Sequence, residues 1–155
     1  MGWRPGKPAT AVLVVFALMQ CYQPKQGAGA AEVEPQSIGA VHKIPGQVAG
    51  ILERSCYDCH SNTTDYPWYS YVQPVGWWLE GHISEGKEEL NFSTFGTYSK
   101  RRQASKLESV AGQVKAGSMP PESYALMHRY ARLTEEEVQV LTQWVQALQD
   151  SLSVE

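Results

Sequence analysis

The sequence predicts an all-α domain with long loops rich in aromatic residues. Four stretches of the 155-residue chain carry apolar side chains at i, i+3 and i+4, the spacing of one helical face. No stretch shows the sustained apolar–polar alternation of a half-buried strand. The chain has five Trp and eight Tyr, many for this length. We therefore expect helices joined by loops whose rings help to enclose the core or a planar cofactor.

The first two predicted helices stand on either side of a loop that contains several Tyr and Trp residues. Residues 48–56 carry apolar side chains at helical spacing, so the first helix leads directly into Cys56. The second helix starts at Pro74, because proline suits the first turn of a helix, and ends near Gly86.

The last two predicted helices carry the clearest end signals. The third covers residues 107–114, and Gly117 is placed to cap its C-terminus. Thr134 and Glu137 form a capping box at the start of the fourth, whose apolar residues share one face as far as Leu148. This fourth helix is the strongest helix prediction in the chain.

The N-terminus resembles an export signal. Arg4 and Lys7 supply its positive charge, and residues 9–19 form an apolar run interrupted only by Thr10. This run is roughly ten residues long, which matches the core of a signal peptide and is short for a bilayer-spanning helix. We therefore expect residues 1–20 to act as a signal peptide and the protein to be exported.

Two processing sites fit this N-terminus. Residues 18–21 resemble a lipoprotein box that would lipidate Cys21 and anchor the chain to a membrane, although Gln20 is larger than the residue usual before that cysteine. Ordinary cleavage after residues 28–30, Ala-Gly-Ala, is the alternative. Residues 21–45 are rich in Pro, Gly, Ala and Gln and are expected to form a flexible tether. The folded domain then covers residues 46–151.

The charge balance argues against a nucleic-acid-binding protein. The chain has 13 basic and 16 acidic side chains and a net charge of −3. A nucleic-acid binder would be expected to show a dominant basic stripe. Removal of the signal takes away two basic residues and makes the mature chain more acidic. We therefore expect no nucleic-acid partner.

Cys56, Cys59 and His60 form the motif that carries the chemistry. The two thiols lie three residues apart on a helical turn and point to one side, and the adjacent imidazole can reach a metal. This arrangement is the attachment signature of a c-type haem, with the histidine as an axial ligand of the iron. A zinc site or a thioredoxin-like dithiol is less well supported, because the sequence has neither a second cysteine pair nor a neighbouring βαβ pattern. The sequence predicts one covalently bound haem c with His60 on the iron.

Met119 is the expected sixth ligand of that iron. It lies between the third and fourth helices, and Pro120 favours an extended backbone at Met119 and stiffens the loop. His82 is the main alternative, because it lies on the apolar side of the second helix. Weaker candidates for the pocket are His42, Met127 and His128.

Other residues have roles that depend on the haem. Tyr66 and Trp68 are expected to line the pocket, or else to fill an ordinary core. Either Pro67 or Pro74 is expected to offer a backbone carbonyl to His60 Nδ1. The basic cluster of residues 100–102 and Lys106 is a solvated helix start, or else a site for an acidic partner or the haem propionates.

Further motifs across residues 46–148 are more specific than Cys-x-x-Cys-His alone. They lie at residues 56–62, 66–69, 82–87, 90–93, 119–124 and 133–134. With them the chain resembles the bacterial haem-binding domain family of small monohaem cytochrome c-like proteins. The resemblance implies a class I cytochrome c-like fold, in which the N- and C-terminal helices cross and haem lies between them and the Met loop. The family pattern includes both His82 and Met119, so the resemblance leaves the sixth ligand open.

The sequence therefore predicts an exported monohaem c-type cytochrome that carries electrons rather than an enzyme. It would lie in the periplasm or on a membrane facing it, with Cys21 as a possible lipid anchor, and its redox partner protein is not specified. The alternative is a haem-based sensor or peroxidase-like protein with a displaceable sixth ligand. A zinc or thiol module without haem is the third hypothesis.

Overall fold

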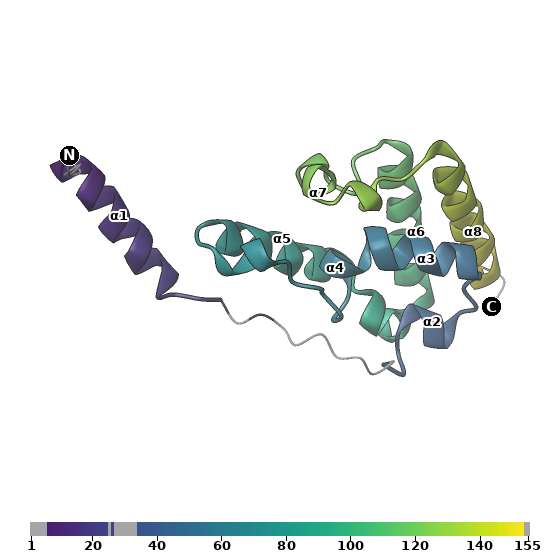
Figure 1. The fold of residues 1–155 in the computed structure, drawn as a ribbon. Helices are drawn as coiled ribbons and strands as arrows, with labels where there is room; N and C mark the ends of the chain where they lie inside the picture. Colours follow the sequence, from purple (N-terminus) through teal and green to yellow (C-terminus); the bar gives the residue numbers. More distant parts are fainter. Residues whose placement is uncertain (1–5, 25, 27–33, 154–155) are drawn as a thin grey trace.

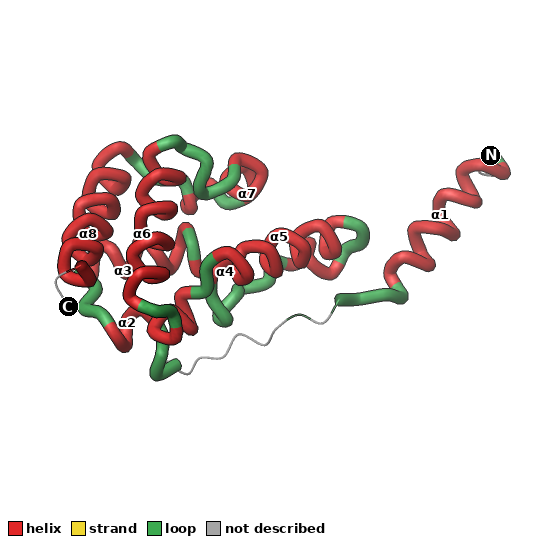
Figure 2. The backbone as a smooth tube through the Cα atoms, turned by 180° about the vertical axis from the view of Figure 1, so that it is seen from behind, coloured by secondary structure: helices red, strands yellow, loops and turns green. Residues whose placement is uncertain are grey.

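The computed structural model describes residues 6–24, 26 and 34–153, and within these residues it contains helices and no strand. The all-α prediction is confirmed (Figures 1 and 2). The α-helices are α1 (Lys7–Gln20), α2 (Ile38–Val41), α3 (Gly46–Ser55), α4 (Tyr57–His60), α5 (Val75–Glu89), α6 (Lys100–Lys115), α7 (Glu122–Met127) and α8 (Glu135–Ser153). Three 3-10 helices are η1 (Trp68–Tyr71), η2 (Phe92–Thr97) and η3 (Arg129–Ala131).

The main core lies where α3, α6 and α8 meet. α6 and α8 pack side by side, and α3 lies across them (Figure 1). The apolar faces of these helices, together with α2, Leu90 and η2, contribute side chains that are almost completely excluded from water. Removal of apolar surface from water is the main driving force of folding. The buried core residues are Ile38, Val48, Ile51, Leu52, Leu90, Phe92, Phe95, Leu107, Val114, Leu141, Val145 and Leu152.

An ion pair joins the end of α3 to the start of α8. Arg54 Nη2 lies 2.6 Å from Glu137 Oε1, and Arg54 Nε donates to the Tyr130 carbonyl at 2.9 Å. Glu137 also completes the predicted capping box, because its carboxylate accepts from Thr134 N and its own N–H donates to Thr134 Oγ1. The same local signal thus starts α8 and fixes it to the helix that leads into Cys56.

A second group of elements, η1 and α5, extends away from this core as an arm (Figure 2). At the outer end of the arm, α5 packs on η1 so closely that a Cβ on Gly76 would overlap the Ser70 carbonyl oxygen. At its inner end, α5 meets α4. α5 continues three residues beyond the predicted end at Gly86 before it stops at Glu89.

The third predicted helix begins earlier than its apolar period suggested. α6 starts at Lys100, with the Ser99 side chain accepting from Arg102 N, so the basic cluster does form a helix start. Its predicted end is confirmed. Gly117 has φ +67°, and the N–H groups of Gly117 and Ser118 donate to the carbonyls of Val114 and Gln113. These bonds form a Schellman motif.

Part of the segment that was predicted to be a tether packs against the main core. The Ile38 side chain of α2 is 1% exposed and belongs to the core, so the packed part begins upstream of residue 46. Arg4 and the Ala-Gly-Ala site at residues 28–30 lie outside the described residues. None of the described helices has the length and apolar character needed to cross a membrane.

Candidate cofactor site

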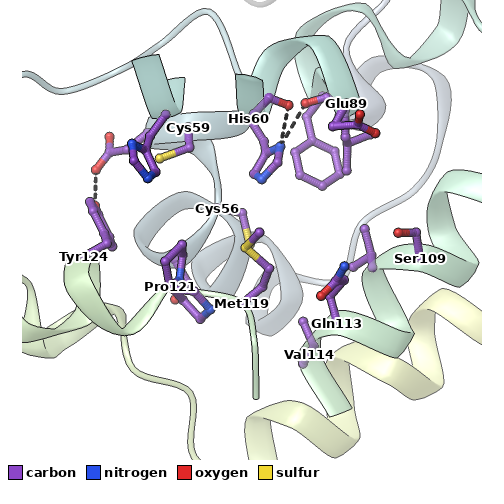
Figure 3. Close-up of a pocket in the computed structure, with 18 of the residues that line it drawn as sticks. Cys56, Cys59, His60, Glu89, Ser109, Gln113, Val114, Met119, Pro121 and Tyr124 are labelled. Carbon is purple, nitrogen blue, oxygen red and sulfur yellow. Dashed lines mark hydrogen bonds between the residues drawn. The ribbon is translucent and has the colours of Figure 1, made fainter. Parts of the chain in front are cut away.

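A cavity of about 350 Å³ lies between the main core, the inner end of the arm and the loop before α7 (Figure 3). Its size is within the range of small-molecule and cofactor pockets, about 300–1,000 Å³. It collects residues from α3 through α7, far apart in the sequence. They are Ser55, Cys56, Asp58, Cys59, His60, His82, Glu85, Gly86, Glu89, Leu90, Phe92, Lys106, Ser109, Val110, Gln113, Val114, Met119, Pro120, Pro121 and Tyr124.

Cys56 and Cys59 both reach this cavity as free thiols, since α4 is a single turn that begins directly after Cys56. Burial raises the pKa of Cys56 to about 12 and that of Cys59 to about 11, and each thiol is therefore neutral at pH 7. No group of three or more His, Cys, Asp or Glu side chains able to hold a metal ion occurs in the described part of the chain. The described residues thus present two thiols and one imidazole rather than a tetrahedral zinc site.

His60 projects into the cavity with one ring nitrogen already engaged (Figure 3). Its Nδ1 lies 2.8 Å from the Gly86 carbonyl oxygen and 3.0 Å from that of Leu90. Gly86 lies in the last turn of α5 and Leu90 follows its end, and the Gly86 carbonyl also accepts from the Leu90 N–H at 2.9 Å. A carbonyl oxygen can only accept a hydrogen bond, so the imidazole must donate to it. Nδ1 is therefore the protonated nitrogen, and Nε2 is the one that can bind a metal.

The sequence suggested Pro67 or Pro74 as the carbonyl partner of His60. In the structure the partners are Gly86 and Leu90 instead. Pro74 lies at the start of α5, whereas His60 meets the other end of that helix. Pro67 lies beside Asp58 and Cys59 but makes no bond to the His60 ring. Sequence reasoning could not choose the partner, because it depends on how far α5 runs and where α5 crosses α4.

Gly86 is a site residue that sequence analysis took only as a helix end. A Cβ at this position would lie 2.6 Å from the Cys59 carbonyl oxygen and 3.3 Å from Cys59 Cβ. Only glycine therefore lets α5 approach α4 closely enough for its carbonyls to reach His60. A glycine inside a helical period was the available signal, because such a glycine usually has a packing or functional reason.

Met119 enters the cavity from the wall opposite His60 (Figure 3). The Schellman motif at Gly117 turns the chain out of α6, and Ser118 Oγ bonds back to the Gln113 carbonyl at 3.0 Å. These bonds, together with the two following prolines, fix the backbone on both sides of Met119. The Met119 side chain is 37% exposed, so its wall of the cavity is open to solvent.

His82 lines the same cavity, and the other candidate ligands do not. Its Nδ1 lies 2.9 Å from the Trp78 carbonyl oxygen, and its ring lies against the Trp78 ring with 4.3 Å between centroids. His82 is exposed rather than buried among apolar residues. Of the others, His42 bonds to Gln103, His128 stacks on Tyr124, and Met127 is 61% exposed.

Asp58 and Tyr124 close one side of the cavity, and sequence analysis gave neither of them a role. Tyr124 Oη donates to Asp58 Oδ2 at 2.5 Å, which ties α4 to the helix that follows the Met-Pro-Pro loop (Figure 3). Burial, and then this hydrogen bond, raise the pKa of Tyr124 above its ordinary value of 10.0. The tyrosine therefore stays protonated and keeps donating at neutral pH.

The polar groups of the cavity fit a haem. Ser55 Oγ is buried beside Cys56 and has no hydrogen-bond partner among the described residues, and such an atom is costly unless an occupant supplies one. Lys106 Nζ lies 3.4 Å from Glu89 Oε2 at the rim, where a cation can meet an acidic group of a ligand. The possible donors are the two thiols, the oriented imidazole and the thioether opposite it, and the rest of the lining is largely apolar.

Tyr66 and Trp68 lie outside this cavity, in contrast to the expectation that they line the pocket. Tyr66 Oη donates to Glu80 Oε2 at 3.1 Å on the arm. Trp68 is 77% exposed at the outer end of the arm. Residue type alone suggested a haem contact, but the Tyr66 hydroxyl is bonded to Glu80 of α5 and the Trp68 side chain is exposed to solvent.

The comparisons with known proteins give one match. A family model described as "Haem-binding domain" matches residues 14–147, which include every cavity residue and also the end of α1. The searches of curated proteins and of solved structures gave no match.

Proposed function

Because the chain belongs to the haem-binding domain family, we propose that it is an exported monohaem c-type cytochrome that carries electrons. Cys56 and Cys59 would hold the haem through thioethers, and His60 and Met119 would be the axial ligands. One observation carries the proposal: His60, with Nε2 left for a metal, faces the Met119 thioether across a cavity whose wall bears both thiols. The bound haem would supply an iron that gains and loses one electron.

The chain's own residues would set the properties of that iron. The α5 carbonyls that accept from His60 Nδ1 increase the basicity of the ring and hold its orientation. A methionine thioether as the second ligand raises the reduction potential relative to a second histidine. Phe92, Val110 and Val114 supply an apolar lining that excludes water.

The proposal includes a class I cytochrome c-like arrangement and export. The Arg54–Glu137 pair, which joins the helix before the motif to the last helix, supports the expected contact between N- and C-terminal helices. The apolar helix α1, whose side chains are mostly exposed, supports a role for residues 1–20 in export or anchoring. Lipidation of Cys21, which is exposed at the end of α1, remains part of this proposal.

A sensor or peroxidase-like protein is the second candidate, and two observations favour it. The Met119 side chain is 37% exposed, and His82 lines the same cavity. A thioether on an open wall is displaced more easily by a small molecule, and a second donor nearby offers an alternative ligand.

The test is absorption spectroscopy of the holoprotein made in the periplasm of a host that attaches c-type haem. Wild type, Met119→Ala, His82→Ala and Met127→Ala are compared in both redox states, with carbon monoxide added to the reduced forms. Met127 is the matched control, because it is a methionine near the same loop but outside the cavity. Extraction with acidified acetone then tests whether the haem is covalently bound.

An electron carrier with His60/Met119 ligation predicts a far-red methionine–iron band in the oxidised wild type, lost only in Met119→Ala. Carbon monoxide should leave the reduced wild type unchanged. Rapid carbon monoxide binding by wild type would favour the sensor or enzyme instead. A band unaffected by Met119→Ala, or haem removed by acetone, would reject the proposed ligand or the proposed attachment.

A further inference from the structure

The chain that follows α1 is bound to the outer end of the arm. Gln20 Oε1 accepts from Gln73 N at 2.9 Å, Gln73 Nε2 donates to Gln23 Oε1 at 2.8 Å, and Gln23 Nε2 donates to the Tyr71 carbonyl at 3.2 Å. Gln26 Nε2 adds a bond to Ser70 Oγ at 2.9 Å. Because the Gln73 side chain is completely buried, these bonds are part of the packing of the arm.

An aromatic contact strengthens this attachment. Trp77 Nε1 donates to the Tyr22 carbonyl at 2.9 Å, and the two rings meet edge to face with 6.0 Å between centroids. Residues on both sides of Cys21 are therefore held on η1 and the first turn of α5. The point where the chain leaves α1 is thus fixed relative to the folded domain.

The same end of the arm exposes large apolar and aromatic side chains. We call this surface the aromatic face and define it by Tyr22, Trp68, Tyr71, Val75 and Trp78, which are between 41% and 77% exposed. Two of them lie in η1 and two in the first turn of α5, elements that pack directly on each other at Gly76. A soluble domain seldom exposes so many large rings at one end without a partner.

The apolar helix α1 and Cys21 indicate what kind of partner covers the aromatic face. α1 ends beside it, and the valines and leucines of α1 are more than half exposed, as in a segment that enters an apolar phase. If Cys21 were lipidated instead, its acyl chains would start at the same place. Both fates bring a lipid bilayer to the aromatic face, and Trp and Tyr are the residues that favour the bilayer–water interface.

We infer that the aromatic face rests on the surface of a phospholipid bilayer and fixes the orientation of the domain. α5 then leads from the membrane to the cavity. With a rise of 1.5 Å per residue, His82 lies about 10 Å and Glu89 about 21 Å along the helix axis from Val75. This distance holds the cavity close to the membrane, within reach of a partner embedded in it. Since cleavage after Ala30 would remove the bound segment, the inference also requires Cys21 and Gln26 to remain in the mature chain.

The experiment is hydroxyl-radical footprinting of the full mature holoprotein in nanodiscs of phosphatidylcholine without other proteins. Tyr71 and Tyr130 form a matched pair, because both are tyrosines, with exposed fractions of 57% and 59%, and Tyr130 lies in η3 beside the main core. We expect oxidation of Tyr71, Trp68 and Trp78 to be several-fold slower than their exposure predicts, with Tyr130 as the reference. Intact mass spectrometry of the same sample shows where the mature chain begins.

A double variant, Gln23→Ala with Gln26→Ala, tests the fixed orientation, because both glutamines bond to the arm and both lie after Cys21. It should restore oxidation of Tyr71 to the level of Tyr130 and leave the haem spectrum unchanged, because neither glutamine contacts the cavity. Equal oxidation of Tyr71 and Tyr130 in the wild type would overturn the inference, and so would protection of Tyr130 alone. A mature chain that begins after Ala30 would overturn it as well. A failure here leaves the ligand assignment untouched, since the two tests read different residues.

Discussion

The main core and the arm hold their shapes in different ways. Around α3, α6 and α8, buried aliphatic and aromatic side chains from distant parts of the chain form one continuous cluster. In η1, α5 and the residues that join them, the buried residues include Ser70 and Gln73, which make polar contacts, and the close approaches depend on Gly76 and Gly86. The core is thus stabilised mainly by apolar burial, whereas the arm depends on a few specific contacts. The cavity lies where the two meet, so an occupant bound there joins them.

The largest expected difference comes from truncating one buried aliphatic residue in each region. Leu141 in α8 is 0% exposed and Ile83 in α5 is 2% exposed. Leu141→Ala should lower the free energy of global unfolding by about 2–5 kcal/mol, because it leaves a cavity in the continuous core. Ile83→Ala should lower it less and should instead increase local opening of the arm. Denaturant titration gives the first quantity, and native-state hydrogen exchange of residues 68–89 gives the second.

An exposed leucine provides the control for these two buried sites. Leu126→Ala, at a site 64% exposed, should change stability by no more than about 0.5 kcal/mol. If Ile83→Ala lowered global stability as much as Leu141→Ala and left exchange in residues 68–89 no faster than in α8, the two regions would form one cooperative unit.

Two glycines of the same helix should respond in opposite directions. Gly86→Ala places a Cβ 2.6 Å from the Cys59 carbonyl oxygen, so α5 must move from α4 and weaken the carbonyl contacts of His60. We expect a loss of about 1–3 kcal/mol, typical of overpacking, and a changed haem spectrum. Gly81→Ala has open space around the new Cβ and should stabilise α5 by about 0.4–1 kcal/mol.

Thermal unfolding and absorption spectra of both glycine variants provide the measurement. Equal stability and unchanged spectra for Gly86→Ala would show that the approach of α5 to α4 does not set the His60 environment. The comparison is internal, because both substitutions add the same methyl group to the same helix.

Local signals in the sequence predicted the features that are themselves local. The capping box at Thr134 and the glycine cap at Gly117 both appear in the structure, and so does the helix that leads into Cys56. The all-α class followed from the helical periods. The placement of Met119 opposite His60 agrees with its expected role, and the role itself remains a prediction.

The features that were missed depend on how distant segments pack. The His60 carbonyl partner, the Asp58–Tyr124 bond and the place of Ser55 in the cavity follow from where α5 and α7 cross the motif. No short sequence pattern encodes such a crossing. Trp68 illustrates the same limit, because its residue type suggested a pocket contact and the fold leaves its side chain exposed at the surface.

A smaller expected loss of stability concerns the junction that fixes α8 to α3. The Thr134 N–H that donates to Glu137, and then Arg54, hold the pKa of Glu137 below its ordinary value of 4.5. The charged form is therefore favoured by folding, and this stabilisation is fully present above pH 4.5 and is lost as the pH falls through the lowered pKa.

Glu137→Gln should lower stability at pH 7 by about 1 kcal/mol, because glutamine keeps the capping box but removes the charge from the ion pair and the helix N-terminus. The difference from wild type should shrink toward zero as the pH falls below 4.5, which thermal unfolding between pH 3 and 7 would measure. Glu136→Gln is the control, since Glu136 is exposed on the same first turn and forms neither the capping box nor the Arg54 pair. A Glu137→Gln difference that stayed constant across this range would mean that packing of the side chain, rather than its charge, fixes α8 to α3.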